Sequence, residues 1–320
     1  MSSTLASTAS LLAKAATEIA WQQWGALGAQ TSDARPAHQA VLDPEALLLV
    51  SLVLLEHERR LADVIVSWVS LNSSLLSVQR VKNLGRAFPP PVQQILSAVA
   101  ATAIQDGKDM RWTSLATSPT TPLAARRGKT RATIPAFLTT ATLMLQLRQG
   151  MGVGVKSDLF AFLLTSNANA RNWASTAAMV RALGYTSAAV RRNADDLAAA
   201  RFIRRMETVD ADSSAARLYM AEPANWAPAL HLGILQPGWR YWLERFAFIA
   251  DVLDTSHKLA QTQATEFATG VACRTLIEKH RTALTRDTGV KPGLFDDSID
   301  WTAALHSASE QLVEWMRNNP

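Results

Sequence analysis

Apolar residues that recur at helical spacing constrain the fold of this chain more than any other feature of its sequence. In residues 239–254, Trp242, Phe246, Ile249 and Leu253 follow one another at intervals of four, three and four residues, which places them on one helix face. Similar patterns, separated by glycine, proline and polar residues, predict further helices over 5–24, 43–55, 61–71, 75–84, 92–104, 133–149, 265–286 and 301–317. We therefore expect a mainly α, multi-helix protein.

Composition narrows the class of protein to which such helices belong. The chain has 320 residues, 48% of them hydrophobic, so two or three packed domains are expected. The single cysteine, Cys273, cannot form an internal disulfide or a cysteine-based zinc cluster, and its apolar neighbours predict a buried thiol. The longest apolar run, residues 46–55, has about half of the ~20 residues that a membrane helix needs. Because the N-terminus also lacks a recognisable signal peptide, we expect a cytoplasmic protein outside the membrane.

The net charge of +5 is concentrated in the middle of the chain. Residues 111–220 contain 15 Lys and Arg against 6 Asp and Glu, whereas residues 1–110 contain 8 against 9 and residues 221–320 contain 9 against 12. The middle third therefore carries +9 between flanks of −1 and −3. Such a concentration of arginine indicates a polyanionic partner, although a solvated basic face would give the same count.

Within this basic third, residues 155–220 combine short helices with a hairpin. One predicted helix begins at Ser157, a second covers 175–183, and a third runs from about Thr186 to residue 200. Ser175 and Thr186 are suited to cap the last two helices, and Gly184 between them permits the left-handed backbone of a sharp turn. Strands are predicted over 202–209 and 216–220, on either side of the polar residues 210–214.

The stretch from Leu183 to Arg192 (LGYTSAAVRR), followed by strand, polar turn and strand, resembles the helix-turn-helix and wing of bacterial winged-helix transcription regulators. The resemblance covers about residues 155–220 and implies a central winged helix-turn-helix with a small β-hairpin wing. It implies a sequence-specific regulator of transcription that binds double-stranded DNA and is expected to repress. Two alternatives stay open: a protein-interaction adaptor that uses the winged helix as a scaffold, and an antitoxin-type protein with a toxin partner.

The helical geometry assigns roles within this motif. At about 100° per residue, Val190, Ala194 and Leu197 face inward on the helix predicted from Thr186 to residue 200, and Arg192 points away from them. Arg192 is the candidate for a guanine edge, because its guanidinium donates two parallel hydrogen bonds, and Arg191 on the flank suits a phosphate. The other candidate DNA contacts lie at two helix starts, on the wing and in a basic linker arm: Lys156, Thr186, Ser187, Ala188, Arg204, Arg205, Arg217, Arg126, Arg127, Lys129 and Arg131.

The predicted elements divide the chain into an N-terminal helical domain (1–110), a basic linker (111–132), the winged helix-turn-helix domain (133–222) and a C-terminal helical domain (223–320). Residues 61–84 are either a second helix-turn-helix or plain packing helices. In the first case the last helix would present Ser77, Gln79, Arg80, Lys82 and Asn83. Because one short recognition helix reads few bases, we expect a homodimer, with the Trp242 to Leu253 stripe as a candidate interface.

An enzymatic function is not predicted. The glycine-rich residues 150–156 follow a predicted helix instead of a strand and lack the Gly-Lys-Ser/Thr sequence of a phosphate loop, so they are interpreted as a joint between domains. The six histidines are scattered without metal-ligand spacing, and Asp195-Asp196 and Asp296-Asp297 have no partner set. We therefore predict no catalytic residue, no metal and no cofactor.

Overall fold

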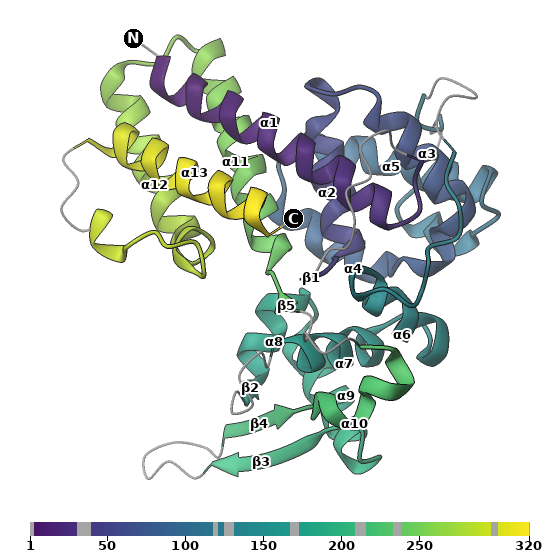
Figure 1. Ribbon diagram of the computed structural model, residues 1–320. Helices are drawn as coiled ribbons and strands as arrows, with labels where there is room; N and C mark the ends of the chain where they lie inside the picture. Colours follow the sequence, from purple (N-terminus) through teal and green to yellow (C-terminus); the bar gives the residue numbers. More distant parts are fainter. Residues whose placement is uncertain are drawn as a thin grey trace.

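The computed structural model describes residues 3–30, 40–117, 121–124, 131–166, 173–208, 216–232, 238–295 and 300–319. Within these ranges the protein has 13 α-helices and five short strands. Figure 1 shows a larger helical body and, below it in this view, a smaller module that contains the β3–β4 hairpin. The mainly α class expected from the sequence is confirmed.

The helical body is built from both ends of the chain (Figure 1). α1 packs along α13 and α11, and α11 also packs against α2. The buried side chains of these helices belong to one hydrophobic cluster, so the predicted N-terminal domain (1–110) and the predicted C-terminal domain from residue 242 onward share a core instead of forming two. Trp226 and Trp239, from the start of the predicted C-terminal domain, pack in a second cluster. The body comprises α1 (Ser3–Ala26), α2 (Pro44–Val53), α3 (Leu61–Asn72), α4 (Val78–Leu84), α5 (Pro91–Gln105), α11 (Trp242–Gln261), α12 (Glu266–Thr285) and α13 (Trp301–Asn318).

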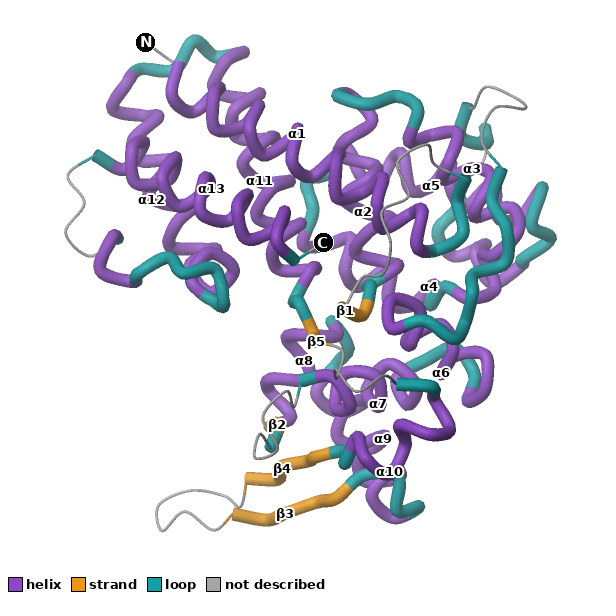
Figure 2. Tube along the Cα trace, in the orientation of Figure 1, coloured by secondary structure: helices purple, strands orange, loops and turns teal. Residues whose placement is uncertain are grey.

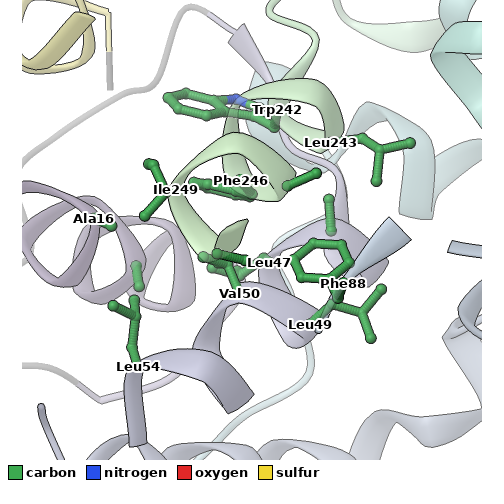
Figure 3. Close-up of a cluster of buried hydrophobic side chains, with 14 of the residues drawn as sticks. Ala16, Leu47, Leu49, Val50, Leu54, Phe88, Trp242, Leu243, Phe246 and Ile249 are labelled. Atoms are coloured by element: carbon green, nitrogen blue, oxygen red, sulfur yellow. The ribbon is translucent and has the colours of Figure 1, made fainter. Parts of the chain in front are cut away.

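The apolar stripe of α11 lies inside this core. Trp242, Phe246, Ile249 and Leu253 are between 0% and 8% exposed. Figure 3 shows Phe246 and Ile249 beside Leu47 and Val50 of α2, with Trp242 on the far side of Phe246. The proposed use of this stripe as a dimer interface is therefore wrong. An amphipathic stripe indicates that a helix face is covered, and here α1, α2 and α12 of the same chain cover it.

The helix predicted over 133–149 is shorter in the structure: α6 covers Leu143–Met151 and so begins ten residues later than predicted. The preceding segment is held in extended form beside the end of α1: the backbone N–H of Thr133 donates to the carbonyl of Gly28 at 2.8 Å. Short 3₁₀ helices join many of the longer elements, at Leu54–Glu56, Ser73–Leu75, Gly85–Ala87, Met110–Ser114, Thr140–Thr142 and Pro292–Leu294.

The smaller module has its own hydrophobic cluster, which includes Leu159, Phe162, Val190 and Tyr219. Its strands form an antiparallel sheet in the order β2-β4-β3, with Ser175 opposite Leu218 and Arg205 opposite Tyr219. Figure 2 shows the β3–β4 hairpin extending from the helices. The module comprises α6, α7 (Val155–Thr165), β2 (Ala174–Ser175), α8 (Thr176–Leu183), α9 (Ser187–Ala199), β3 (Arg204–Thr208), β4 (Ala216–Met220) and α10 (Pro223–Leu230).

A two-residue parallel pairing lies at the boundary between body and module. β1 (Ala40–Val41) precedes α2, β5 (Gly238–Trp239) precedes α11, and Ala40 is paired with Gly238. Val41 and Trp239 are buried in the module cluster, whereas Leu42 and Trp242 are buried in the core of the body. The two helices that leave this boundary therefore start against the module and continue into the body.

The residues predicted to cap α8 and α9, and the glycine predicted in the turn between these helices, have the expected geometry. Ser175 Oγ accepts a hydrogen bond from the backbone of Ala178 at 3.2 Å, and Thr186 Oγ1 accepts one from Ala189 at 3.3 Å. Gly184 has a φ of +71°, the left-handed conformation that glycine adopts at low cost. A Cβ at this position would lie 2.1 Å from Leu84 Cδ2, so the turn also needs glycine for its close approach to α4.

Among the described residues, no single helix is long and apolar enough to span a membrane. One pair, residues 61–75 and 78–87, meets the length and composition criteria only when taken together, and it is bent by 119° at the break.

Candidate nucleic-acid interface

The outer face of α9 presents small residues and two arginines. Ser187, Ala188, Arg191 and Arg192 are all exposed. On the opposite face, Val190, Ala194 and Leu197 are buried, as the helical geometry predicted. Residues with short side chains at the start of the helix leave its backbone open to close approach, and the arginines follow one turn later.

Three of the candidate arginines have no carboxylate partner in the described part of the chain. Arg191, Arg192 and Arg204 are exposed and form no ion pair with any residue in the described part of the chain. Arg201 lies between α9 and β3 and is likewise exposed, although the sequence analysis did not single it out. These guanidinium groups can donate hydrogen bonds to an incoming anion without first breaking an internal salt bridge.

The other two wing arginines are held by a carboxylate of α9. Asp195 accepts hydrogen bonds from Arg217 at 2.7 Å, from Arg205 at 3.3 Å and from the hydroxyl of Tyr219 at 2.9 Å. Burial and then the hydrogen bond to Asp195 raise the pKa of Tyr219 to about 12. Glu207 on β3 also lies within 3.5 Å of Arg205 and 3.8 Å of Arg217. The hairpin is therefore fastened to α9, and part of its positive charge is neutralised.

Lys156, the predicted phosphate contact at the start of α7, is paired in the same manner. Its Nζ lies 2.9 Å from Asp196 Oδ2, and both side chains are about half exposed. An exposed pair of this kind contributes only ~0–1 kcal/mol, so an anionic ligand can compete with it.

A buried ion cluster connects the body to the turn that starts α9. Arg80 of α4 has no exposed surface, and its Nη atoms contact Asp43 at 2.5 Å and Glu45 at 2.6 Å. Its Nε donates to the carbonyl of Leu183, the last residue of α8, at 2.8 Å. Arg80 therefore links the N-terminus of α2 to the C-terminus of α8.

Arg148 of α6 completes the cluster from the module. It donates to Glu45 at 2.7 Å and to Asp158 of α7 at 2.7 Å, and Tyr185 donates to Asp158 at 2.7 Å. Burial alone would raise the pKa of Glu45, but the adjacent charges of Arg148 and Arg80 outweigh it and lower that pKa below its ordinary value. The charged form of Glu45 is thereby favoured in the interior, between the two guanidinium groups.

The cluster fixes the position of the α8–α9 turn relative to the body. Tyr185 follows Gly184 directly, and the side-chain amide of Asn83 on α4 donates to the carbonyl of Gly184 at 3.3 Å. The interpretation of residues 61–84 as a second DNA-reading helix-turn-helix is therefore not supported, because Ser77 and Arg80 are buried and Asn83 faces the module. These residues instead support the first motif.

The basic linker arm is described only in part. Arg126, Arg127 and Lys129 lie outside the described residues. Arg131 is exposed, and its carbonyl accepts a hydrogen bond from Gln30 at 2.8 Å, beside the end of α1. Arg131 is thus placed on the helical body, and the structure does not bring it to the α9 surface.

Comparison with known proteins gives no relative: no family model, no curated protein and no solved structure matches this chain. A search of the described residues also finds no group of three or more His, Cys, Asp or Glu side chains arranged to hold a metal ion. The function of the chain is therefore inferred from the geometry of the module itself.

Proposed function

We propose that residues 155–220 form a winged helix that binds double-stranded DNA, and that the protein is a sequence-specific transcriptional regulator, expected to repress. The element order α7, β2, α8, α9, β3, β4 and the strand order β2-β4-β3 support a winged helix, since a helix-turn-helix is followed by a hairpin that pairs with a strand before it. The observation that carries the proposal is the outer face of α9, with small residues at its start and two arginines that pair with no carboxylate among the described residues.

In this proposal α9 lies in the major groove. Arg192 donates two hydrogen bonds to O6 and N7 of a guanine, Arg191 contacts a phosphate, and Ser187 and Ala188 allow close approach. Arg204 on the hairpin contacts a phosphate or the minor groove. A protein-interaction scaffold would use the same face of α9, but its binding would not need the positive charge of that face. The dependence of binding on charge therefore distinguishes the two functions.

The most direct functional experiment is a gel shift of the purified full chain on the DNA upstream of its own coding sequence, together with selection from a random duplex library. We expect a shifted complex and an enriched, palindromic sequence. A homodimer on such a site stays a prediction, and light scattering of the protein with and without DNA measures it. Failure to enrich any sequence would contradict sequence-specific binding.

Asp195 limits the charge that the wing presents, and its removal is expected to change DNA binding. Asp195→Asn should remove the closer of the two carboxylates that pair with Arg205 and Arg217, with Glu207 left at 3.5 and 3.8 Å. It should steepen the logarithmic dependence of affinity on salt by about 1–2 units, since each phosphate contact contributes about 0.9. Affinity for DNA of unrelated sequence should rise at low salt, as measured by fluorescence anisotropy.

The matched control is Asp196→Asn, which removes the neighbouring carboxylate but leaves the hairpin pairs intact. It can free only Lys156, so its salt dependence should change by at most about 1 unit. If Asp195→Asn changed binding no more than Asp196→Asn, the hairpin would not contact DNA.

A further inference from the structure

Four buried N–H donors around the start of α11 have no acceptor among the described residues. They are Nε of Arg240, Nε1 of Trp242, and Nε and Nη1 of Arg245. They lie where β5 joins the module to the body, and Figure 1 shows the end of α13 beside the start of α11. Unsatisfied donors in a protein interior are uncommon, so their concentration within residues 240–245 indicates an acceptor from outside the chain.

Arg245 is the most deeply buried of these residues. It is 1% exposed, and its Cζ lies 3.8 Å from the centre of the Trp315 ring on α13. Its Nη2 donates to the backbone carbonyl of Arg286 at 2.7 Å, which leaves Nε and Nη1 to be satisfied. Arg240 is half-buried, and its Cζ lies 5.9 Å from the centre of the same ring. The two guanidinium groups are therefore close together beside Trp315.

The carboxylates nearby do not compensate the charge of Arg245. Four charged groups act on it: the cations Arg240 and Arg286, and the carboxylates Glu244 and Asp287. Glu244 pairs with Arg286 at 3.0 Å, and its other oxygen, Oε1, accepts no hydrogen bond within the described chain. Asp287 is exposed and forms no ion pair with a described residue. Burial consequently lowers the pKa of Arg245 to about 10, and the site has three cations against two carboxylates.

The two loops that meet here have an uncommon backbone conformation. Tyr241 has a φ of +49° and Asp287 a φ of +60°, in the left-handed region that residues with a side chain adopt at a cost. Arg286 connects the two loops, because its Cζ lies 3.8 Å from the centre of the Tyr241 ring. Strained residues of this kind gather at ligand sites, where the surrounding contacts hold them in place.

We propose that Arg240, Trp242 and Arg245 bind a small oxyanion, the class of ligand that includes carboxylates and phosphates. Its oxygens would accept hydrogen bonds from the four donors, and its negative charge would compensate the two guanidinium groups. The side chain of Arg240 folds back on Gly238, since a Cβ there would lie 3.4 Å from Arg240 Cζ, and movement of this half-buried side chain would admit the ligand from solvent. This inference does not depend on the proposed DNA-binding function.

The test is a calorimetric titration of the full chain with inorganic phosphate and, separately, with acetate, in a chloride buffer that contains neither. We expect saturable binding of at least one of them, and the ratio of their affinities distinguishes a phosphate site from a carboxylate site. Arg245→Met should abolish this binding. Arg240→Ala should weaken it about tenfold or more, the loss expected for one hydrogen bond between charged groups.

Thermal unfolding separates a ligand-binding role of Arg245 from a structural one. Because methionine removes a buried charge without a carboxylate partner, Arg245→Met should not lower the thermal midpoint in chloride buffer. The bound oxyanion should raise the midpoint of the wild type but not that of this variant. A midpoint several degrees lower in chloride buffer would show that Arg245 is already satisfied within the protein, and would overturn the proposal.

Two further variants keep the binding result decisive. Arg274→Met removes an exposed arginine of α12 that pairs with Glu278, and it should bind the oxyanion as the wild type does. Arg240→Ala tests the site independently of Arg245→Met, because Arg240 is only half-buried. No saturable binding of either anion, or equal affinities in Arg240→Ala and Arg274→Met, would also overturn the proposal.

Discussion

Replacing Arg148 with methionine should lower the free energy of unfolding by about 3–5 kcal/mol, the usual cost of removing one partner from a buried ion pair. Methionine occupies much of the volume of arginine but cannot donate to Glu45 or Asp158, whose side chains are both fully buried. Asp158 would then retain only the hydrogen bond from Tyr185 among the contacts within this cluster. Urea denaturation followed by circular dichroism measures the change.

The matched control is Arg274→Met, because Arg274 is paired with Glu278 at 2.8 Å on the exposed surface of α12. That pair should contribute no more than ~1 kcal/mol. In addition, combining Arg148→Met with Asp158→Asn should cost less than the sum of the two single changes, since the second removes the carboxylate that the first leaves unpaired. Equal losses in Arg148→Met and Arg274→Met would contradict the role given to the cluster.

Replacing Arg192 with alanine should weaken binding to the selected operator by about 1–3 kcal/mol and relax the base preference at one position. The reason is that a bidentate contact to guanine distinguishes this base from the others. Arg191→Ala, by contrast, should weaken binding to all duplexes alike, because a phosphate contact carries no sequence information. Anisotropy titrations on the operator and on a scrambled duplex separate the two effects.

Arg181 on α8 provides the control for both variants. It is exposed and lies in the same module, but on the helix that precedes the turn. Arg181→Ala should change operator affinity less than either α9 variant. An Arg192→Ala protein that bound its operator as tightly as the wild type would refute the position of α9 in the groove.

Much of the fold could be predicted because helix starts and ends depend on nearby residues. Ser175, Gly184 and Thr186 each act within three or four residues of their own position, so their roles are visible in the sequence. The inward face of α9 follows from helical periodicity for the same reason. The short strand β2 was not predicted, since two residues carry too little pattern to identify a strand.

The buried cluster could not be predicted in the same way, because its partners are far apart in sequence. Arg80 and Arg148 both contact Glu45, from 35 and 103 residues away, and each arginine looks like an ordinary surface residue in its own helix. One local signal was present: Glu45 opens a helix that is apolar along almost its whole length and buried on nearly all sides. A carboxylate at such a position requires a buried cation.

The apolar stripe of α11 shows a second limit of prediction from the sequence. Periodicity established correctly that one face of 242–253 is covered, but it carries no information on whether the covering surface belongs to the same chain. The charge count has a related limit, because Arg148, one of the 15 basic residues of the middle third, is buried and adds nothing to a surface.

The salt dependence of duplex binding is the measurement that decides whether the α9 face binds double-stranded DNA. Anisotropy of a labelled duplex should be measured with the full chain across about 50–200 mM salt. If Arg191, Arg204 and neighbouring cations contact about three or more phosphates, the slope of log affinity against log salt should be about −3 or steeper. A slope near zero, or no binding at the lowest salt, would contradict DNA binding and favour the protein-interaction scaffold.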